Sequence, residues 1–234
     1  MKKRLLAAAL CLCLLLCAGC STTQAQINQY NAALYVRGLL DETYTGAPGG
    51  DYLQLMDITA EDAQETFEKN LDMEFSQRLA VRFELDEVFL KSDLKADYLE
   101  LLKQVYAKAS YTVVQAAPLD HGRYCVEVSV TPVTFFQAAY ADGYAMLRAD
   151  FEKAHPLPDE EKRADMTSAQ LRKANENFES KWAQEVYDYL YARLDAITTD
   201  PAVTKLVLVT PGSGGDYTLS ATDFQDIDDL ILQY

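Results

Sequence analysis

Beyond residue 20 the chain has almost none of the residues that form disulfide frameworks or histidine-based active sites. Four of its five cysteines lie within the first 20 residues, which leaves Cys125 alone in the rest of the chain. Histidine occurs only twice, as His121 and His155. A body with a single cysteine cannot be held together by internal disulfides, and a histidine base for catalysis has only two candidates.

Long apolar runs and basic residues are also scarce after residue 20. No later stretch is long and apolar enough to cross a membrane. Residues 1–19 contain three basic and no acidic residues, so the remainder has 18 Lys and Arg against 36 Asp and Glu. A surface with this charge is repelled by phosphate backbones, and the sequence shows no cluster of Lys and Arg that offsets it. Nucleic acid is therefore excluded as an expected partner.

The first 20 residues have the order of an export signal. Three basic residues at positions 2–4 precede an apolar run over residues 5–16, and Cys17-Ala18-Gly19-Cys20 follows. This segment resembles the bacterial lipoprotein signal, in which the cysteine after two small residues is acylated and becomes the first residue. It departs from that pattern at Cys17, where the family usually has leucine, and Leu16 lies one position earlier.

The resemblance implies a signal peptide over 1–19, lipidation at Cys20 with acyl chains such as palmitate, and a lipidated polar spacer over 20–26. The expected location is then the cell membrane, with the protein lipid-anchored on the extracytoplasmic face. Two or three acyl chains hold a protein on a bilayer where one holds it marginally. The alternatives are a secreted protein cleaved after a small residue, or an uncleaved apolar anchor.

Periodicity divides the remaining chain into helices and two β-hairpins. Alternating residues predict strands over 111–116 and 124–130 around a turn at 118–122, and over 203–209 and 216–220 around a turn at 211–215. The expected helical stripes are Ile27, Tyr30, Leu34, Arg37, Leu40 and Tyr44; Ala63, Phe67, Leu71, Phe75, Leu79 and Phe83; Leu94, Tyr98, Leu101, Leu102, Val105 and Tyr106; Phe136, Tyr140, Gly143, Leu147 and Phe151; Leu171, Ala174, Phe178, Trp182, Glu185, Tyr189, Arg193 and Ile197; and Phe224, Ile227, Leu230 and Ile231.

This order of elements predicts an α+β fold with two antiparallel β-hairpins. Helices plus a first hairpin occupy 27–132, and helices plus a second hairpin occupy 133–234. The repeated order suggests a duplicated helices-plus-hairpin unit. The hairpins could join into one four-stranded sheet or belong to two lobes, and 27–234 could form one domain.

Helix starts are predicted from capping residues. Thr59 with Asp62, and Thr167 with Gln170, have the spacing of a capping box. Ser92 or Asp93 is expected to cap the helix that follows, and Thr222 with Gln225 the last helix. The stretches 40–46 and 57–63, with the helix and hairpin after them, are similar to uncharacterised lipoproteins of Gram-positive gut bacteria, including those with the domain of unknown function DUF5105. That resemblance implies a surface lipoprotein and supplies no catalytic residue.

Candidate chemical groups are few. His121 and His155 are interpreted as solvated surface residues, and Cys125 as a half-buried filler of its strand. Four acids near the end could suggest a cation site, but they fit better as the solvated face and N-terminal charge of the last helix; they are Asp223, Asp226, Asp228 and Asp229. The Gly-rich segment 211–215 lacks the Gly-Lys-Ser/Thr ending of a phosphate loop. We therefore assign no catalytic residue, metal or cofactor.

The 15 tyrosines and Trp182 could stack on sugars, but most fall on core stripes with the hydroxyl expected at the rim. Three functions remain. The first is a non-enzymatic module that binds a protein, peptide or small molecule. The second is a cell-envelope glycan hydrolase, which requires a carboxylate pair in a cleft. The third is a structural spacer or assembly partner, which requires a flat apolar patch and no cavity.

Overall fold

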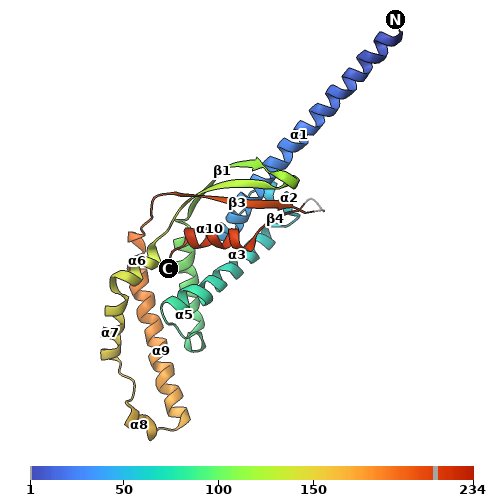
Figure 1. Ribbon diagram of the computed structural model, residues 1–234. Coiled ribbons are helices and arrows are strands. Elements are labelled where there is room, and N and C mark those ends of the chain that lie inside the picture. Colours follow the sequence, from blue (N-terminus) through green and yellow to red (C-terminus); the bar gives the residue numbers. More distant parts are fainter. Residues whose placement is uncertain (1, 213–215) are drawn as a thin grey trace.

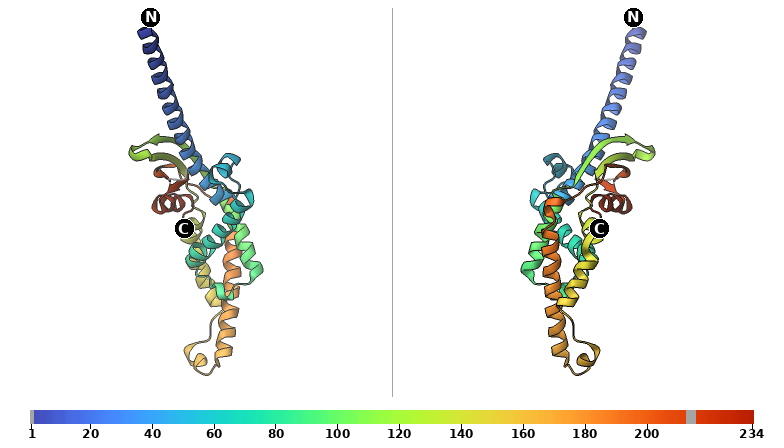
Figure 2. Two further views of the ribbon diagram at one scale, coloured as in Figure 1. Left: turned by 90° about the vertical axis from the view of Figure 1, so that its right-hand side faces the viewer. Right: turned by 90° about the vertical axis from the view of Figure 1, so that its left-hand side faces the viewer.

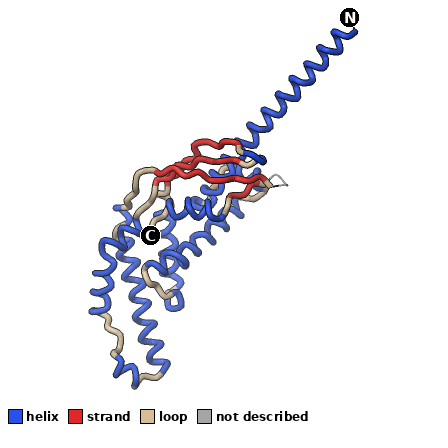
Figure 3. The backbone as a smooth tube through the Cα atoms, viewed as in Figure 1, coloured by secondary structure: helices blue, strands red, loops and turns tan. Residues whose placement is uncertain are grey.

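A computed structural model describes residues 2–212 and 216–234, with the side chains from residue 24 onward. The strands lie together in one layer. The N-terminal helix projects past them on one side, and most of the other helices lie on the opposite side (Figures 1 and 3). The helical elements before the first strand are α1 (Lys2–Thr45), α2 (Gly50–Met56), α3 (Ala60–Glu74), the π-helical turn η1 (Phe75–Leu79), α4 (Ala80–Arg82), the 3₁₀ turn η2 (Glu87–Phe89) and α5 (Ser92–Tyr106).

The first hairpin then leads into the second group of helices. Its strands are β1 (Ser110–Pro118) and β2 (Tyr124–Thr131), joined through the turn η3 (Asp120–Gly122). The elements that follow are α6 (Phe135–Ala139), the π-helical turn η4 (Tyr140–Tyr144), α7 (Ala145–Ala154), α8 (Glu160–Ala164), α9 (Ser168–Tyr191), the turn η5 (Leu194–Ala196), β3 (Val203–Pro211), β4 (Tyr217–Leu219) and α10 (Ala221–Ile231). Residues 213–215 of the predicted second turn lie outside the described residues.

Both hairpins belong to one antiparallel sheet with strand order β1-β2-β3-β4. The prediction of an α+β fold with two antiparallel hairpins is confirmed, and of the two arrangements left open the single sheet is correct. Strand β2 buries the predicted alternate residues, which are Tyr124, Val126, Val128 and Val130. Helices α1 and α10 pack against the sheet. Duplication of the helices-plus-hairpin unit stays a prediction.

The expected helix from Thr59 runs as α3, η1 and α4. Thr59 accepts the N–H of Asp62, and the side chain of Asp62 accepts the N–H of Thr59, so the predicted capping box is confirmed. Residues four apart rotate by about 40° per step around an α-helix. The π-helical turn η1 contains one extra residue per turn, which counteracts that rotation. All six stripe residues from Ala63 to Phe83 are buried as a result.

Trp182 anchors the second helical group to the first. It is fully buried, and its indole N–H donates to the carbonyl of Phe83 at 3.0 Å. The ring of Tyr144 at the end of η4 and the ring of Phe151 in α7 contact the Trp182 indole, with 5.9 and 5.1 Å between ring centroids. Helices α7, α8 and α9 then extend away from the sheet as an arm (Figures 1 and 2).

Several local predictions are wrong. Lys91 occupies the N-cap position of α5 and provides no side-chain cap, so neither Ser92 nor Asp93 precedes the helix. Ser220 caps α10 by accepting the N–H of Asp223, in place of Thr222. Ser220 and Thr222 both have a hydroxyl that can cap a helix, so the second error is a shift of two residues between equivalent side chains. The first has another reason, because α5 begins directly after Lys91, whose ammonium group cannot accept a backbone N–H.

Two apolar stripes are displaced. In α1 the side chains of Ile27 and Tyr30 are exposed. The buried hydrophobic residues there are Ala32, Tyr35, Val36, Leu40 and Tyr44. In α9 the stripe moves after Trp182 to Val186 and Leu190. The hydroxyl of Tyr98 in α5 donates to the carbonyl of Ala183, so α5 covers this face of α9 and sets which residues are buried.

Candidate functional site

Among the grooves that the described residues form, two adjoin groups of polar side chains with features of a functional site. One lies where α1, α3, η1 and α10 meet, and we name it the Arg78 cluster, after its central residue. The other lies between α5 and α9 in the arm, and we name it the arm groove. Neither was assigned from the sequence, because each is assembled from segments far apart in the chain.

Arg78 is the centre of the first group. Its Nη1 is 2.7 Å from Oδ2 of Asp228, and its Nη2 donates to the carbonyl of Leu232 at 2.9 Å. It also lies 3.6 Å from a carboxylate oxygen of Glu74 and 3.3 Å from one of Asp229. The π-helical turn η1 holds Arg78 one helical turn after Glu74, and α10 places Asp228 opposite. The guanidinium of Arg78 thus contacts three carboxylates and the backbone carbonyl of Leu232.

Burial gives these groups unusual pKa values. The pKa of Glu74 is raised to about 7 by burial, which outweighs the attraction of Arg78. Tyr44 donates its hydroxyl proton to Oδ1 of Asp228, and burial followed by that carboxylate raises the pKa of Tyr44 well above its usual value. Tyr106 and Tyr234 complete the cluster, each with its pKa raised mainly by burial.

A hydrolase reading of the Arg78 cluster has one point in its favour and two against it. A neighbouring groove of about 420 Å³ is lined by Glu74, Asp228 and Asp229, and Glu74 has the raised pKa of a general acid. Both oxygens of Asp228 are already engaged, however, one by Tyr44 and the other by Arg78. Arg78 also neutralises the charge that a second carboxylate would need. This geometry favours a structural connection between helices over glycoside hydrolysis.

The four acids of α10, which were predicted to form a solvated face, each contact a specific partner. Asp223 lies in the first turn as predicted, and it also accepts the backbone N–H of Leu208 in β3 at 2.9 Å. Asp226 pairs with Lys205 at 3.4 Å. The solvated interpretation is wrong for Asp228, which is largely buried. Within the part of the chain that the structure describes, no group of three or more His, Cys, Asp and Glu side chains could hold a metal ion.

The remaining candidates lie apart from both groups. His121 is an exposed turn residue with a φ of 61°. His155 is half-buried against the ring of Phe151 at the end of α7. Neither imidazole has a hydrogen bond to a Ser, Thr or Cys side chain among the described residues. Cys125 is a half-buried free thiol on the outer face of the sheet, opposite Leu208. Cys20 lies in α1, in the part whose side chains are not described.

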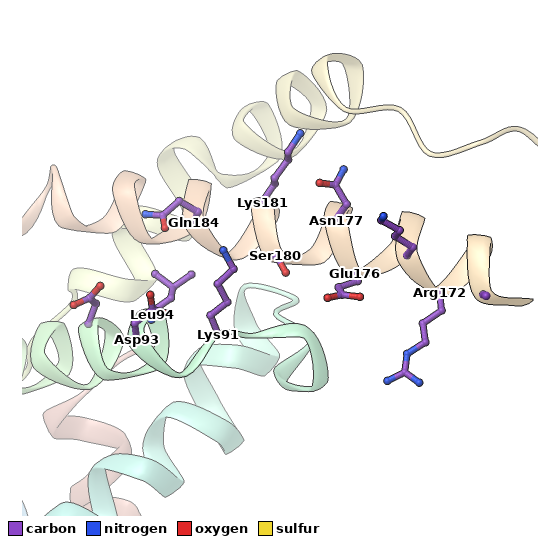
Figure 4. Close-up of a pocket in the computed structure, with 12 residues that line it drawn as sticks. Lys91, Asp93, Leu94, Arg172, Glu176, Asn177, Ser180, Lys181 and Gln184 are labelled. Carbon is purple, nitrogen blue, oxygen red and sulfur yellow. Dashed lines mark hydrogen bonds between the residues drawn. The ribbon is translucent and has the colours of Figure 1, made fainter.

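The arm groove has a volume of about 720 Å³. Its walls are the first two turns of α5 and the N-terminal two thirds of α9 (Figure 4). The cations that line it are Lys91, Arg172, Lys173 and Lys181, the acids are Asp93, Asp97 and Glu176, and the uncharged residues are Leu94, Ala169, Asn177, Ser180 and Gln184. In Figure 4 Lys91 extends from the start of α5 towards α9, and Arg172 extends from the far end of α9.

None of the four groove cations forms a salt bridge with another described residue. Eight other basic side chains do, which are Arg37, Lys69, Arg78, Lys95, Lys103, Arg148, Lys162 and Lys205. The sequence shows no basic cluster because Lys91 is separated from the other three by about 80 residues. Only the packing of α5 against α9 brings them together.

Comparison with known proteins finds a likeness of fold. No model of a protein family matches the chain, and no curated protein matches its sequence. The structure is similar to the crystal structure of the predicted lipoprotein YcdA from Bacillus subtilis subsp. subtilis strain 168, with a TM-score of 0.55 and 13% sequence identity. The match covers 91% of this chain and 59% of that protein. The resemblance to proteins with DUF5105 stays a prediction.

Proposed function

We propose that this protein is a lipid-anchored lipoprotein on the extracytoplasmic face of the cell membrane. The observation that carries the proposal is Cys20, which follows a basic start, an apolar run and two small residues. The similarity of fold to the predicted lipoprotein YcdA supports it. No helix among the described residues is both long and apolar enough to span a bilayer.

We infer further that the body is a non-catalytic binding module. The Arg78 cluster supports this, because both carboxylate oxygens of Asp228 are engaged, one by Tyr44 and the other by Arg78, so Asp228 is not free to act on a substrate beside Glu74. The arm groove supports a binding role, because it is concave and its cations have no partners within the described chain. A spacer would present a flat apolar patch without a cavity, and the grooves do not meet that condition.

The anchor is tested by labelling cells that express the protein with an alkyne-bearing fatty acid. We expect the wild-type protein to incorporate the label and to fractionate with membranes. Replacing Cys20→Ser should abolish the label and leave the precursor uncleaved, because the hydroxyl cannot take the thioether-linked lipid.

Cys17→Ser and Cys125→Ser are the matched controls, and both should retain the label. A labelled Cys20→Ser variant would contradict the proposal. An unlabelled wild-type protein in the medium, shortened at its N-terminus, would favour the secreted alternative. An unlabelled, full-length protein in the membrane fraction would favour the uncleaved apolar anchor.

A further inference from the structure

Two segments without a charged residue lie side by side in this strongly acidic protein. The first is 20–36, which belongs to α1, and the second is 110–119, which contains β1. Helix α1 packs against β1. Charged residues make up 24% of the whole chain, so two uncharged segments in contact mark a distinct part of its surface.

Strand β1 runs along α1 towards the proposed anchor. The hydroxyl of Tyr111 donates to Asp41 at 2.9 Å, and the side-chain amide of Gln29 donates to the carbonyl of Ala116. Between residues 111 and 116 of β1, the contact on α1 thus moves back from residue 41 to residue 29, towards Cys20. The hairpin of β1 and β2 accordingly lies at the end of the body from which α1 projects (Figures 1 and 2).

These two segments expose apolar side chains near that end. Ile27 and Tyr30 are exposed on α1, three residues apart and therefore on neighbouring parts of one helix face. Leu119 is exposed where the hairpin turns, and Val114 is exposed on β1. We name Ile27, Tyr30 and Leu119 the anchor-side surface.

The charged residues beside the anchor-side surface are few and mostly engaged. Asp120 and Arg123 in the hairpin turn have opposite charges, and the Nε–H of Arg123 donates to the carbonyl of Asp120 at 3.3 Å. The carboxylates of Asp51 and Glu127 each accept a hydrogen bond from a neighbouring side chain. The surface next to the anchor is therefore close to neutral.

We propose that the anchor-side surface rests on the bilayer that holds Cys20. This inference depends on the proposed lipid anchor and adds the orientation of the body. Seven residues of helix separate Ile27 from Cys20, which is about 10 Å along the axis. The headgroup layer on each side of a bilayer is about 5–8 Å thick, so an acylated Cys20 keeps Ile27 and Tyr30 close to that layer.

The chemistry of the anchor-side surface suits the membrane interface. A tyrosine ring with its polar end in water is typical of headgroup level, and Ile27 and Leu119 gain free energy when they leave water. The absence of acids from both segments removes the repulsion that anionic headgroups exert on the rest of the chain. The bilayer is also the partner that the anchor holds within reach of this surface.

The opposite end of the body is the arm formed by α7, α8 and α9 (Figures 1 and 2). In the proposed orientation the arm points away from the membrane. A leucine of the arm, Leu157 between α7 and α8, is 40% exposed, and Leu119 is 44% exposed. These two residues provide a matched pair of sites for a test.

The inference is tested with the full chain, expressed with its signal and placed in phosphatidylcholine nanodiscs that contain a nitroxide-headgroup lipid. In a Cys125→Ser background, a fluorophore is attached at Leu119→Cys or at Leu157→Cys. We expect the nitroxide lipid to remove most of the fluorescence at position 119 and none at position 157. High salt should leave the quenching at position 119 unchanged, because the contact is apolar.

A double variant tests the contribution of α1. With the fluorophore at position 119, Ile27→Glu and Tyr30→Glu together should relieve most of the quenching, because two charges must then be placed against the bilayer. The matched control is Val81→Glu with Val88→Glu, which adds the same charge at exposed valines outside the anchor-side surface. It should leave the quenching unchanged. Circular dichroism establishes that each variant is folded, and a fluorophore at Ala117→Cys replaces that at Leu119→Cys if the latter is not.

Equal quenching at positions 119 and 157, or no quenching at 119, would overturn the inference. Quenching at 119 that disappears in high salt would overturn it as well, since docking would then be electrostatic. Self-quenching at 119 that needs a second protein in the nanodisc, and not the nitroxide lipid, would replace the bilayer by a second copy of the chain.

The intact mass of each preparation reports the acyl chains on Cys20 separately. An acylated protein without quenching at position 119 refutes the anchor-side surface and leaves the anchor in place. A protein without acyl chains refutes the anchor, and with it the orientation proposed from the anchor.

Discussion

At the scale of single residues, Glu74 is subject to two opposing effects. Burial disfavours its charged form, and the nearby guanidinium of Arg78 favours it. Burial is the larger effect, so the pKa of Glu74 rises from 4.5 to about 7. The carboxylates of Asp228 and Asp229 add repulsion from α10. The charged form of Glu74 is therefore less stable in the folded protein than in the unfolded chain.

This gives a pH-dependent prediction for Glu74→Gln. Because the folded pKa is raised, the folded protein binds more protons than the unfolded chain between about pH 4.5 and pH 7. The contribution of Glu74 to stability is then present below pH 4.5 and lost as the pH rises towards 7. We expect the variant to become more stable relative to wild type over this range, by up to about 3 kcal/mol.

The measurement is urea denaturation of both proteins at several pH values from 5 to 8. Glu65→Gln is the control, since Glu65 is an exposed acid of the same helix. Its difference from wild type should vary by less than about 0.5 kcal/mol over this range. A constant difference between Glu74→Gln and wild type would show that Glu74 does not titrate in this range.

At the scale of elements, α1 and α2 pack at a position where only glycine fits. A Cβ built on Gly38 of α1 would overlap the ring of Tyr52 in α2. Tyr52 is buried there, and its hydroxyl donates to Glu42 at 2.7 Å, which fixes the ring in place. The close approach of these two helices therefore depends on the absence of a side chain at Gly38.

We expect Gly38→Ala to destabilise the protein by about 1–3 kcal/mol, because the extra methyl group must displace Tyr52. Gly50→Ala is the control, since a Cβ on Gly50 meets no atom within 4 Å. That variant should be unchanged or slightly more stable, because alanine favours the helix. Thermal or urea denaturation distinguishes the two. Equal stability of Gly38→Ala and wild type would mean that α2 can move away at little cost.

The start of a helix was predictable where the residues that cap it lie within a few positions of one another. The capping boxes of Thr59 and Thr167 are confirmed because both partners belong to the same helical turn. The buried line of α9 was predictable only as far as Trp182. Beyond it, α5 packs on the face that carries Val186 and Leu190, and Glu185 is exposed. Periodicity identifies a helix, but the neighbouring helix selects the buried face.

At the scale of the whole molecule, Arg78 joins the first helices to the end of the chain. It is 150 residues from Asp228 and 154 from Leu232, and it contacts both. The ring of Tyr234 lies 4.7 Å from its guanidinium carbon and stacks on Phe136 of α6. Strand-like pairing of Val133 with Leu232 closes the same junction. The C-terminal segment is thus held by groups from both halves of the chain.

Replacing Arg78→Leu should cost about 2–4 kcal/mol, because Asp228 is left largely buried without its cation. Hydrogen exchange should show that the loss of backbone amide protection is concentrated in α10 and residues 232–234. The double variant Arg78→Leu and Asp228→Leu should recover part of that loss, since no unpaired charge remains.

Lys69→Leu is the control for this prediction, because its salt bridge with Glu65 is exposed. It should change stability by less than about 0.5 kcal/mol. If Arg78→Leu and Lys69→Leu behave alike, the Arg78 cluster does not hold the C-terminal helix in place.

The sequence by itself determined the α+β class, the two hairpins, most helix positions and the residue on which the proposed anchor rests. These depend on spacing and on contacts between residues a few positions apart, so a linear pattern contains them. Only the tertiary structure decided that the hairpins form one sheet, that Arg78 pairs with Asp228, and that Lys91 joins the cations of α9. Each of these brings together residues separated by tens to more than a hundred positions, and such contacts are set by packing, not by local pattern.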